Sequence, residues 1–148
     1  MVNEFMEQAY QFALKAYNLG EVPVGCVIVK DGKIIASGYN TRELDNSVLG
    51  HAEINAIKKA SLKLNNYRLD GCDMYVTMEP CIMCCGAIMQ THINKVYFAV
   101  YDGKFGGVES LTHCFDVQGA NHFVKYQCMY DQRVADLLKD FFKNKRNK

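Results

Sequence analysis

The chain has 148 residues, an ordinary apolar content and a formal net charge of +1 at pH 7. This length predicts a single domain over residues 1–148, and the near-neutral charge excludes a strongly basic protein, so nucleic acid would have to be held by a local patch. No apolar run approaches the roughly 18 residues of a membrane span, and the acidic N-terminus does not resemble a signal peptide, so we expect no membrane partner.

The seven cysteines are an odd number, and their spacing is unlike that of a secreted disulfide scaffold. This usage favours a reducing compartment, the cytoplasm, with some of the cysteines bound to a metal.

The N-terminal third of the chain predicts a helix followed by a β-hairpin. Residues 3–18 place apolar side chains at helical spacing and end at Gly20. Two β-rich runs, residues 24–30 and 33–39, are separated by Asp31-Gly32, which is a strong hairpin signal. The polar loop that follows, residues 40–47, is as consistent with plain surface as with the lining of a site.

The rest of the chain predicts alternating helices and strands. Helices are expected from His51 to about Leu64, from Pro80 to Thr91 (with Pro80 in the first helical turn), and over residues 131–146. Strands are expected over residues 73–78, 95–101 and 122–127, and a long glycine-containing loop over 102–120. Alternation of this kind is typical of an α/β protein in which helices cover a sheet with parallel neighbours.

Two short motifs carry the chemistry of this chain. His51-Ala52-Glu53 offers an imidazole and a carboxylate, and Pro80-Cys81-Ile82-Met83-Cys84 offers two thiols three positions apart. One imidazole and two thiolates leave one position of Zn²⁺ open, which is typical of catalytic zinc sites; structural sites use four protein ligands.

The placement of the two motifs suits a hydrolytic reaction. Both lie at predicted helix N-termini, which stabilise negative charge and favour thiolates. Zn²⁺ lowers the pKa of a bound water from 15.7 toward about 7, and Glu53 can take its proton and pass it to a substrate nitrogen. This combination predicts attack on an electron-poor C–N bond with loss of ammonia.

A closed structural zinc site is the alternative, with Cys85 or His92 as a fourth ligand. Cys85 lies roughly 100° around the predicted helix from Cys84 and points away, so we expect it to be a packed core residue. His92, at the end of the same helix, is expected at the surface or in the core.

The chain resembles the zinc-dependent nucleobase deaminases, whose signature is H-x-E followed by P-C-x-x-C. Among them it is most similar to the tRNA-specific adenosine deaminases, on the stretches LGEVPVG at 19–25, YRLDG at 67–71, YVTMEPC at 75–81, DGKFGG at 102–107 and FFKNKR at 141–146. The resemblance implies a three-layer α/β/α cytidine-deaminase-like fold with a mixed sheet of about five strands. It also implies a homodimer that binds a tRNA anticodon stem-loop and converts the wobble adenosine to inosine.

The resemblance also implies roles for individual residues of this chain. One Zn²⁺ per subunit would be bound by His51, Cys81 and Cys84, and Glu53 would be the catalytic proton shuttle. Substrate-binding residues would be Asn40 at the flipped nucleotide, Asp102 and Lys104 in the RNA cleft, and Phe142 and Arg146 at the anticodon loop. The alternative interpretation of the segment with the last two residues is a basic helix end that only faces solvent.

Two other functions remain open from the sequence. The same motifs occur in small-molecule deaminases that act on guanine, cytosine or a nucleotide, and turnover of free bases would favour this class. A zinc-stabilised RNA-binding protein without activity is the third possibility, although a carboxylate beside an open zinc position argues against it.

Overall fold

The computed structural model describes residues 3–117 and 122–146 and contains one five-stranded mixed sheet. The strand order is β2-β1-β3-β4-β5, where β1 pairs antiparallel with β2 and β3, and β4 pairs parallel with β3 and β5. The strands are β1 (Gly25–Lys30), β2 (Lys33–Tyr39), β3 (Cys72–Met78), β4 (Lys95–Val100) and β5 (Lys125–Cys128). The predicted α/β class and mixed sheet are confirmed.

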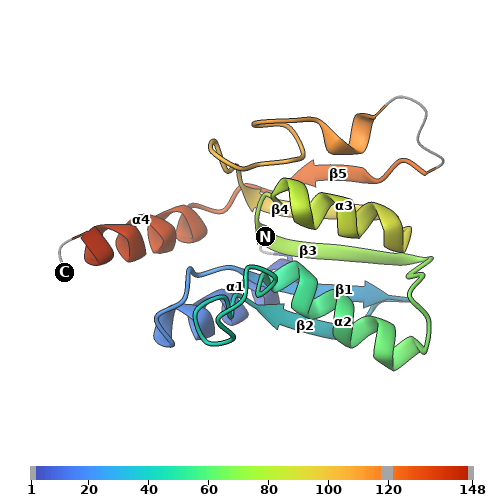
Figure 1. Ribbon diagram of the computed structural model, residues 1–148, viewed down its shortest axis with the longest axis horizontal. Helices are drawn as coiled ribbons and strands as arrows, with labels where there is room; N and C mark the ends of the chain where they lie inside the picture. The colour runs from blue at the N-terminus through green and yellow to red at the C-terminus, as the bar shows by residue number, and fades with distance from the viewer. Residues whose placement is uncertain (1–2, 118–121, 147–148) are drawn as a thin grey trace.

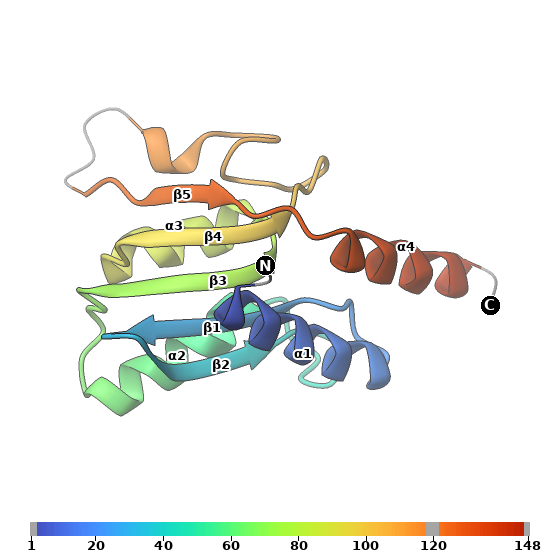
Figure 2. The same ribbon diagram turned by 180° about the vertical axis from the view of Figure 1, so that it is seen from behind.

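Helices cover both faces of the sheet. They are α1 (Glu4–Asn18), α2 (Ala52–Leu64), α3 (Ile82–Thr91) and α4 (Gln132–Arg146), with a short 3₁₀ helix, η1, at Cys114–Asp116. Figure 1 shows α2 and α3 side by side on one face, and Figure 2 shows α1 on the other. Helix α4 follows β5 and extends beyond the end of the sheet. The layers are therefore α/β/α, as the resemblance implies.

The alternation of β1 shows why both faces need a cover. Cys26 and Ile28 belong to the apolar cluster that packs against α2 and α3, whereas Val27 and Val29 belong to the cluster formed with α1 and α4. Successive side chains of a strand point to opposite faces, so an uninterrupted apolar run requires helices on both sides. Full burial of a valine or isoleucine side chain stabilises the folded protein by about 1.5–3 kcal/mol.

The predicted hairpin is confirmed. Asp31 and Gly32 both have positive φ, 51° and 76°, as a two-residue type I′ turn requires. The turn sets β1 and β2 in antiparallel register. Strand β2 then runs back along β1 and ends at Tyr39, before the loop that leads to α2.

The structure corrects the expected start of α3. Pro80 was expected in the first helical turn, but the helix begins at Ile82 and Cys81 is its N-cap, with extended backbone at φ −74° and ψ 174°. Cys81 is still extended because it forms an isolated β-bridge with Gly106. The last strand also begins later than expected, at Lys125, and the long loop contains η1. Residues 118–121 of that loop lie outside the described residues.

Among the helices in the described part of the chain, none has the combination of length and apolarity that crossing a bilayer demands.

Candidate active site

His51 occupies the junction between the polar loop and α2. It is the N-cap of α2 in an extended conformation, and its carbonyl accepts the N–H of Asn55 at 2.9 Å. The loop is closed just before it, because Thr41 N–H donates to the Gly50 carbonyl at 2.8 Å. These backbone bonds fix the direction in which the imidazole leaves the helix.

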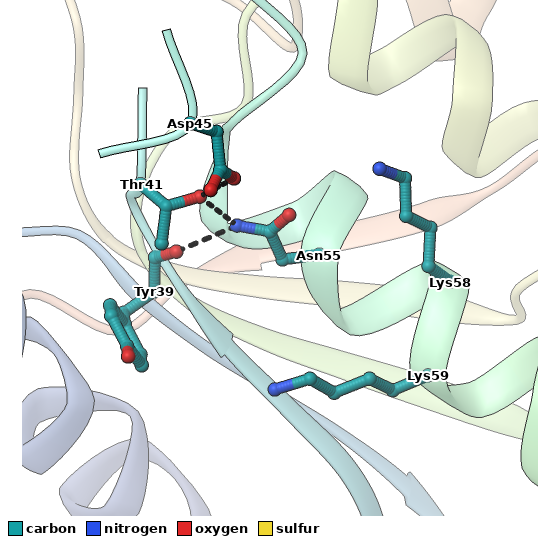
Figure 3. A pocket seen from close by; sticks show the side chains of 6 residues that line it. All are labelled: Tyr39, Thr41, Asp45, Asn55, Lys58 and Lys59. Carbon is teal, nitrogen blue, oxygen red and sulfur yellow. Dashed lines mark hydrogen bonds between the residues drawn. The ribbon is translucent and has the colours of Figure 1, made fainter. Parts of the chain in front are cut away.

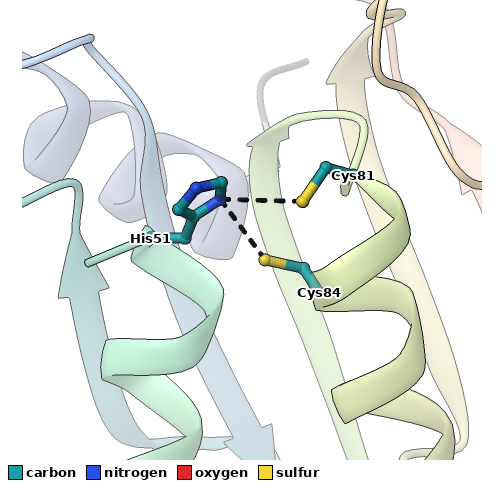
Figure 4. Close-up of side chains that lie close together, drawn as sticks. All are labelled: His51, Cys81 and Cys84. Atoms are coloured by element: carbon teal, nitrogen blue, oxygen red, sulfur yellow. Dashed lines mark hydrogen bonds between the residues drawn. The ribbon is translucent and has the colours of Figure 1, made fainter. Parts of the chain in front are cut away.

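Cys81 and Cys84 come from the turn between β3 and α3. The turn is fixed on its outer side by the Gly107 N–H, which donates to the Pro80 carbonyl at 2.8 Å. Cys81 is partly exposed, whereas Cys84, one helical turn later, is fully buried. Figure 4 shows the two thiols pointing from α3 toward the ring of His51, which projects from the start of α2.

The three side chains fit a zinc ion. The Nδ1 atom of His51 lies 3.7 Å from the Cys81 sulfur and 3.5 Å from the Cys84 sulfur. Tetrahedral Zn²⁺ with its usual bond lengths places such nitrogen and sulfur ligands about 3.6 Å apart. Among the described residues, His51, Cys81 and Cys84 are the one group of this kind, so the donor set leaves a position open.

Neither proposed fourth ligand joins the group. Cys85 is fully buried, and its thiol donates to the Pro80 carbonyl at 3.6 Å, which agrees with the expected packed residue. His92 ends α3 at the opposite end from Cys81, and its ring lies 4.8 Å from that of His122. The geometry therefore supports an open site and not a closed structural one.

Cys81 and Cys84 shift each other's pKa in opposite directions. The thiol of Cys84 donates toward Cys81, and together with His51 this lowers the pKa of Cys81 to about 4 against the opposing effect of burial. The same contact and burial raise the pKa of Cys84 above its ordinary value. Zinc ligands must be deprotonated, so zinc binding at this pair would favour the thiolate form of both side chains.

Glu53 lies in the first turn of α2, two residues after His51, and its side chain is only 4% exposed. Burial raises the pKa of Glu53 to about 7, and the negative charge of Cys81 acts in the same direction. A carboxyl group buried beside the ligands is placed where the predicted proton shuttle is needed.

The predicted substrate residues Asn40, Asp102 and Lys104 lie in the two loops next to the ligands. Asn40 is buried at the end of β2, and its Oδ1 accepts the N–H of Arg42 at 2.9 Å. Asp102 follows β4 and its Oδ1 accepts the N–H of Lys104 at 3.1 Å. The loop containing both residues reaches the metal turn through the bridge of Gly106 with Cys81.

Phe142 and Arg146 are not brought into this arrangement. Phe142 lies on α4, is 43% exposed, and packs its ring against Phe141. Arg146 is the last residue of α4, and its side chain lies outside the described part of the structure. Helix α4 extends beyond the sheet. The contact of these residues with RNA stays a prediction.

A separate pocket lies among the end of β2, the loop that follows it and α2 (Figure 3). It is lined by Tyr39, Thr41, Asp45, Asn55, Lys58 and Lys59. The Asn55 amide donates to the Tyr39 carbonyl and to the Thr41 hydroxyl, both at 2.9 Å. These bonds join α2 to the two residues that flank Asn40. The pocket lining contains none of the three candidate ligands.

Two buried carboxylates that the motifs did not single out support the loops. Glu21 accepts the N–H groups of Glu43 and Leu44, and Glu79 accepts several N–H groups of the loop after β4. Both belong to stretches that carry the resemblance, LGEVPVG and YVTMEPC, but an acidic residue in a motif gives no sign of which distant backbone groups it will bind.

A family model places this fold and ligand set in a known class. The model of the cytidine and deoxycytidylate deaminase zinc-binding region matches residues 1–100. The chain therefore belongs to the cytidine and deoxycytidylate deaminase zinc-binding family, and the zinc cofactor expected from the sequence is the family's cofactor.

Within this family, the chain is similar to tRNA-specific adenosine deaminases. That of Aquifex aeolicus is 43% identical over 143 residues, covering 97% of this chain and 95% of the relative. A solved structure from a study of A-to-I editing by tRNA:A34 deaminases at the wobble position matches with a TM-score of 0.87 and 38% identity, over 90% of this chain and 98% of that one. A guanine deaminase from Bacillus subtilis matches with a TM-score of 0.65 and 32% identity, over 99% and 96% of the chains.

Proposed function

We propose that the chain is a hydrolase that deaminates the wobble adenosine of a tRNA anticodon loop to inosine. The observation that carries the proposal is the three-ligand set of His51, Cys81 and Cys84, at 3.5–3.7 Å spacing, with the buried carboxyl of Glu53 two residues from one ligand. The tRNA adenosine deaminases that match nearly the whole chain support the choice of substrate.

Each residue then has a definite task in the reaction. Zn²⁺ held by His51, Cys81 and Cys84 supplies the Lewis acidity that makes water nucleophilic at neutral pH. Glu53 accepts a proton from the attacking water and delivers it toward the amino nitrogen of the base. The water oxygen bonds to C6 of adenine, the C6–N6 bond breaks, and ammonia leaves. Asn40 binds the flipped nucleotide beside this carboxyl.

RNA binding needs a surface outside the metal site. We assign it to Asp102 and Lys104 in the loop after β4, and to Phe142 and Arg146 near the end of α4. A loop adenosine is already unpaired, so extruding it from the anticodon requires little energy compared with a base in a duplex. Because the net charge is only +1, affinity rests on the local basic residues and weakens as salt rises.

We also infer a homodimer that acts in the cytoplasm, where the tRNA substrate is found. Large apolar side chains are exposed around the metal turn and the loop after β4, namely Ile82, Tyr101, Phe105 and Leu111. A group of exposed apolar side chains is typical of a contact surface. Light scattering of the purified protein would test the dimer, and a monomer at micromolar concentration would contradict it.

The function is tested by incubating zinc-loaded protein with an anticodon stem-loop that carries adenosine at the wobble position. The expected result is ammonia release with conversion of that adenosine, and no other, to inosine, read by sequencing the reacted RNA. Free guanine, cytosine and adenosine serve as parallel substrates. Zinc-loaded protein without deamination of any substrate would instead favour an RNA-binding protein.

A guanine deaminase is the second candidate, favoured by the 32% identity with the Bacillus subtilis enzyme. Its expected result is the reverse: turnover of free guanine without turnover of the stem-loop. The two candidates share the zinc chemistry, so the experiment separates them by substrate alone.

A further inference from the structure

Glu79 lies two residues before Cys81, is 3% exposed, and accepts five hydrogen bonds from one loop. The loop, residues 102–110, follows β4. Oε1 accepts the N–H of Asp102 at 3.0 Å and the hydroxyl of Ser110. Oε2 accepts the N–H groups of Val108, Glu109 and Ser110 at 3.0, 2.8 and 3.0 Å. A carboxylate that is satisfied this fully has no remaining capacity for a metal.

This carboxylate joins the two ends of the loop. Asp102 and Ser110 are separated by seven residues but donate to the same oxygen, Oε1. The middle of the loop packs directly on the group, since a Cβ added to Gly106 would collide with the Glu79 carboxylate. Hydrogen bonds to an ionised acceptor are roughly twice as strong as neutral ones, so one side chain sets the shape of the whole segment.

The same loop is attached to the metal turn. Gly107 N–H donates to the Pro80 carbonyl at 2.8 Å, and Gly106 forms a β-bridge with Cys81. The turn with the thiols, the carboxylate of Glu79 and the loop with Asp102 and Lys104 therefore form one connected unit. A shift of the loop would therefore change the surface beside the ligands.

We propose that Glu79 is a positioning residue that holds the 102–110 loop in the shape that binds the RNA substrate. The inference rests on the proposed function, because it assigns the loop to RNA binding. A residue needed only for general stability would lower the unfolding temperature without a selective effect on substrate binding. A positioning residue loosens this loop and weakens RNA binding more than it slows the chemical step.

Three variants separate these roles. Glu79→Gln keeps the shape of the side chain but replaces one acceptor oxygen with an NH₂ group that faces N–H donors. Ser110→Ala removes one of the five donors and serves if the first variant does not fold. Ile28→Val removes one methyl group from the fully buried centre of β1, and is the control for stability alone.

The first measurement is amide hydrogen exchange on the zinc-loaded proteins, which does not depend on activity. In Glu79→Gln, the amides of Asp102, Val108, Glu109 and Ser110 should exchange roughly tenfold faster or more, as loss of about 1.4 kcal/mol of local stability implies, with a smaller change in Ser110→Ala. In Ile28→Val, the exchange rates of these loop amides should change no more than those of the sheet amides. Unchanged exchange in Glu79→Gln would overturn the proposal.

The second measurement is steady-state deamination of the anticodon stem-loop. Glu79→Gln should raise KM roughly tenfold with kcat within about threefold of the wild type, whereas Ile28→Val should change neither. A fall in kcat at constant KM in Glu79→Gln would overturn the inference. A rise in KM of the same size in Ile28→Val would also overturn it, because the effect would then follow from lower stability alone. A wild-type protein inactive on RNA would overturn the proposed function instead, a result distinct from unchanged exchange.

Discussion

Gly38 in β2 packs directly against the backbone of Ala52, the first residue of α2. A Cβ added to Gly38 would lie 2.7 Å from the amide nitrogen of Ala56 and would collide with the Ala52 carbonyl oxygen. The absence of a side chain at this one strand position lets the helix that begins beside His51 lie close to the sheet. The candidate metal ligand His51 is therefore placed by a glycine thirteen residues earlier in the chain.

Gly38→Ala should therefore push α2 away from β2. We expect a loss of about 1–3 kcal/mol in stability, typical of overpacking against backbone, together with faster loss of zinc to a chelator because His51 moves. Thermal unfolding and chelator competition measure the two effects. Gly86→Ala in α3 is the control, since nothing lies within 4 Å of its added Cβ. That variant should be neutral or stabilised by about 0.5–1 kcal/mol; equal destabilisation of both would contradict the explanation.

Replacing either metal thiol should abolish stoichiometric zinc binding. Cys81→Ser and Cys84→Ser each leave two protein ligands, and serine is a poor ligand for zinc at neutral pH. Metal analysis after gel filtration should show about one zinc per chain in the wild type and far less in both variants. Cys128→Ser is the matched control, since that thiol lies in β5 and donates to the Ala99 carbonyl at 3.9 Å. Loss of zinc in this control would show that the site is misassigned.

Glu53→Gln should separate metal binding from catalysis. The amide keeps the size of the side chain but cannot shuttle a proton, so zinc should remain while deamination falls by about 10²–10⁴-fold. Initial rates of inosine formation and zinc content are the measurements. Glu4→Gln, an exposed change in the first turn of α1, should leave both unaffected. Deamination by Glu53→Gln at near the wild-type rate would remove Glu53 from the mechanism.

Phe142→Ala should weaken binding of the anticodon stem-loop and leave zinc content unchanged. Stacking of a base on an aromatic ring contributes about 1–3 kcal/mol, so KM should rise roughly tenfold with little change in kcat. Phe123→Ala is the comparison, since Phe123 is similarly exposed but lies just before β5. Equal effects from the two changes would place the RNA contact elsewhere than on α4.

Arg133 links α4 to α1 and should make stability depend on pH in acid. It contacts Glu7 and Asp131, both at 2.9 Å. Hydrogen bonds from Gln11 and Arg133 hold the pKa of Glu7 below its ordinary value of 4.5, and Arg133 holds the pKa of Asp131 below 3.8. Carboxylates with a lowered folded pKa stabilise the protein fully above about pH 4.5, and this contribution is lost as the pH falls through the folded values.

Arg133→Met should therefore lower the free energy of unfolding at pH 7 by under about 1 kcal/mol, because the ion pairs are partly exposed. The variant should also lose less stability than the wild type as the pH falls from about 5 to 3, because the two carboxyl pKa values are no longer lowered by Arg133. Urea unfolding at a series of pH values measures both. Lys139→Met removes a charge from an exposed side chain of the same helix that makes no salt bridge in the described structure. The same change in pH dependence for both variants would argue that net charge, and not the ion pairs, is responsible.

Local patterns predicted most of the secondary structure and the grouping of the candidate metal ligands. The Asp31-Gly32 turn depends on a short stretch and is confirmed, and His51, Cys81 and Cys84 lie close together, as the two motifs predict. The role of these three residues in binding zinc stays a prediction. The expectation that residues 1–148 form a single domain stays a prediction, as do the roles of the RNA-facing residues.

Features that depend on distant contacts could not be predicted. The donors to Glu79 lie 23 to 31 residues away in sequence, so no local pattern points to them. The expectation for Pro80 was wrong for the same reason, because the bridge between Cys81 and Gly106 keeps the chain extended where proline alone favours a helical turn. The course of α4 beyond the sheet depends on packing of Val134 and Leu138 against the far end of the core.

His51 and Cys81 lie 30 residues apart, with α2 and all of β3 between them. An ion held by both would act as a covalent staple does, joining the starts of α2 and α3 and closing a long chain segment into a ring. By the chain-entropy argument used for disulfides, closing a ring of this size opposes unfolding by about 3–4 kcal/mol. A chelator should therefore lower the unfolding temperature, and the enzyme would lose stability and its catalyst together.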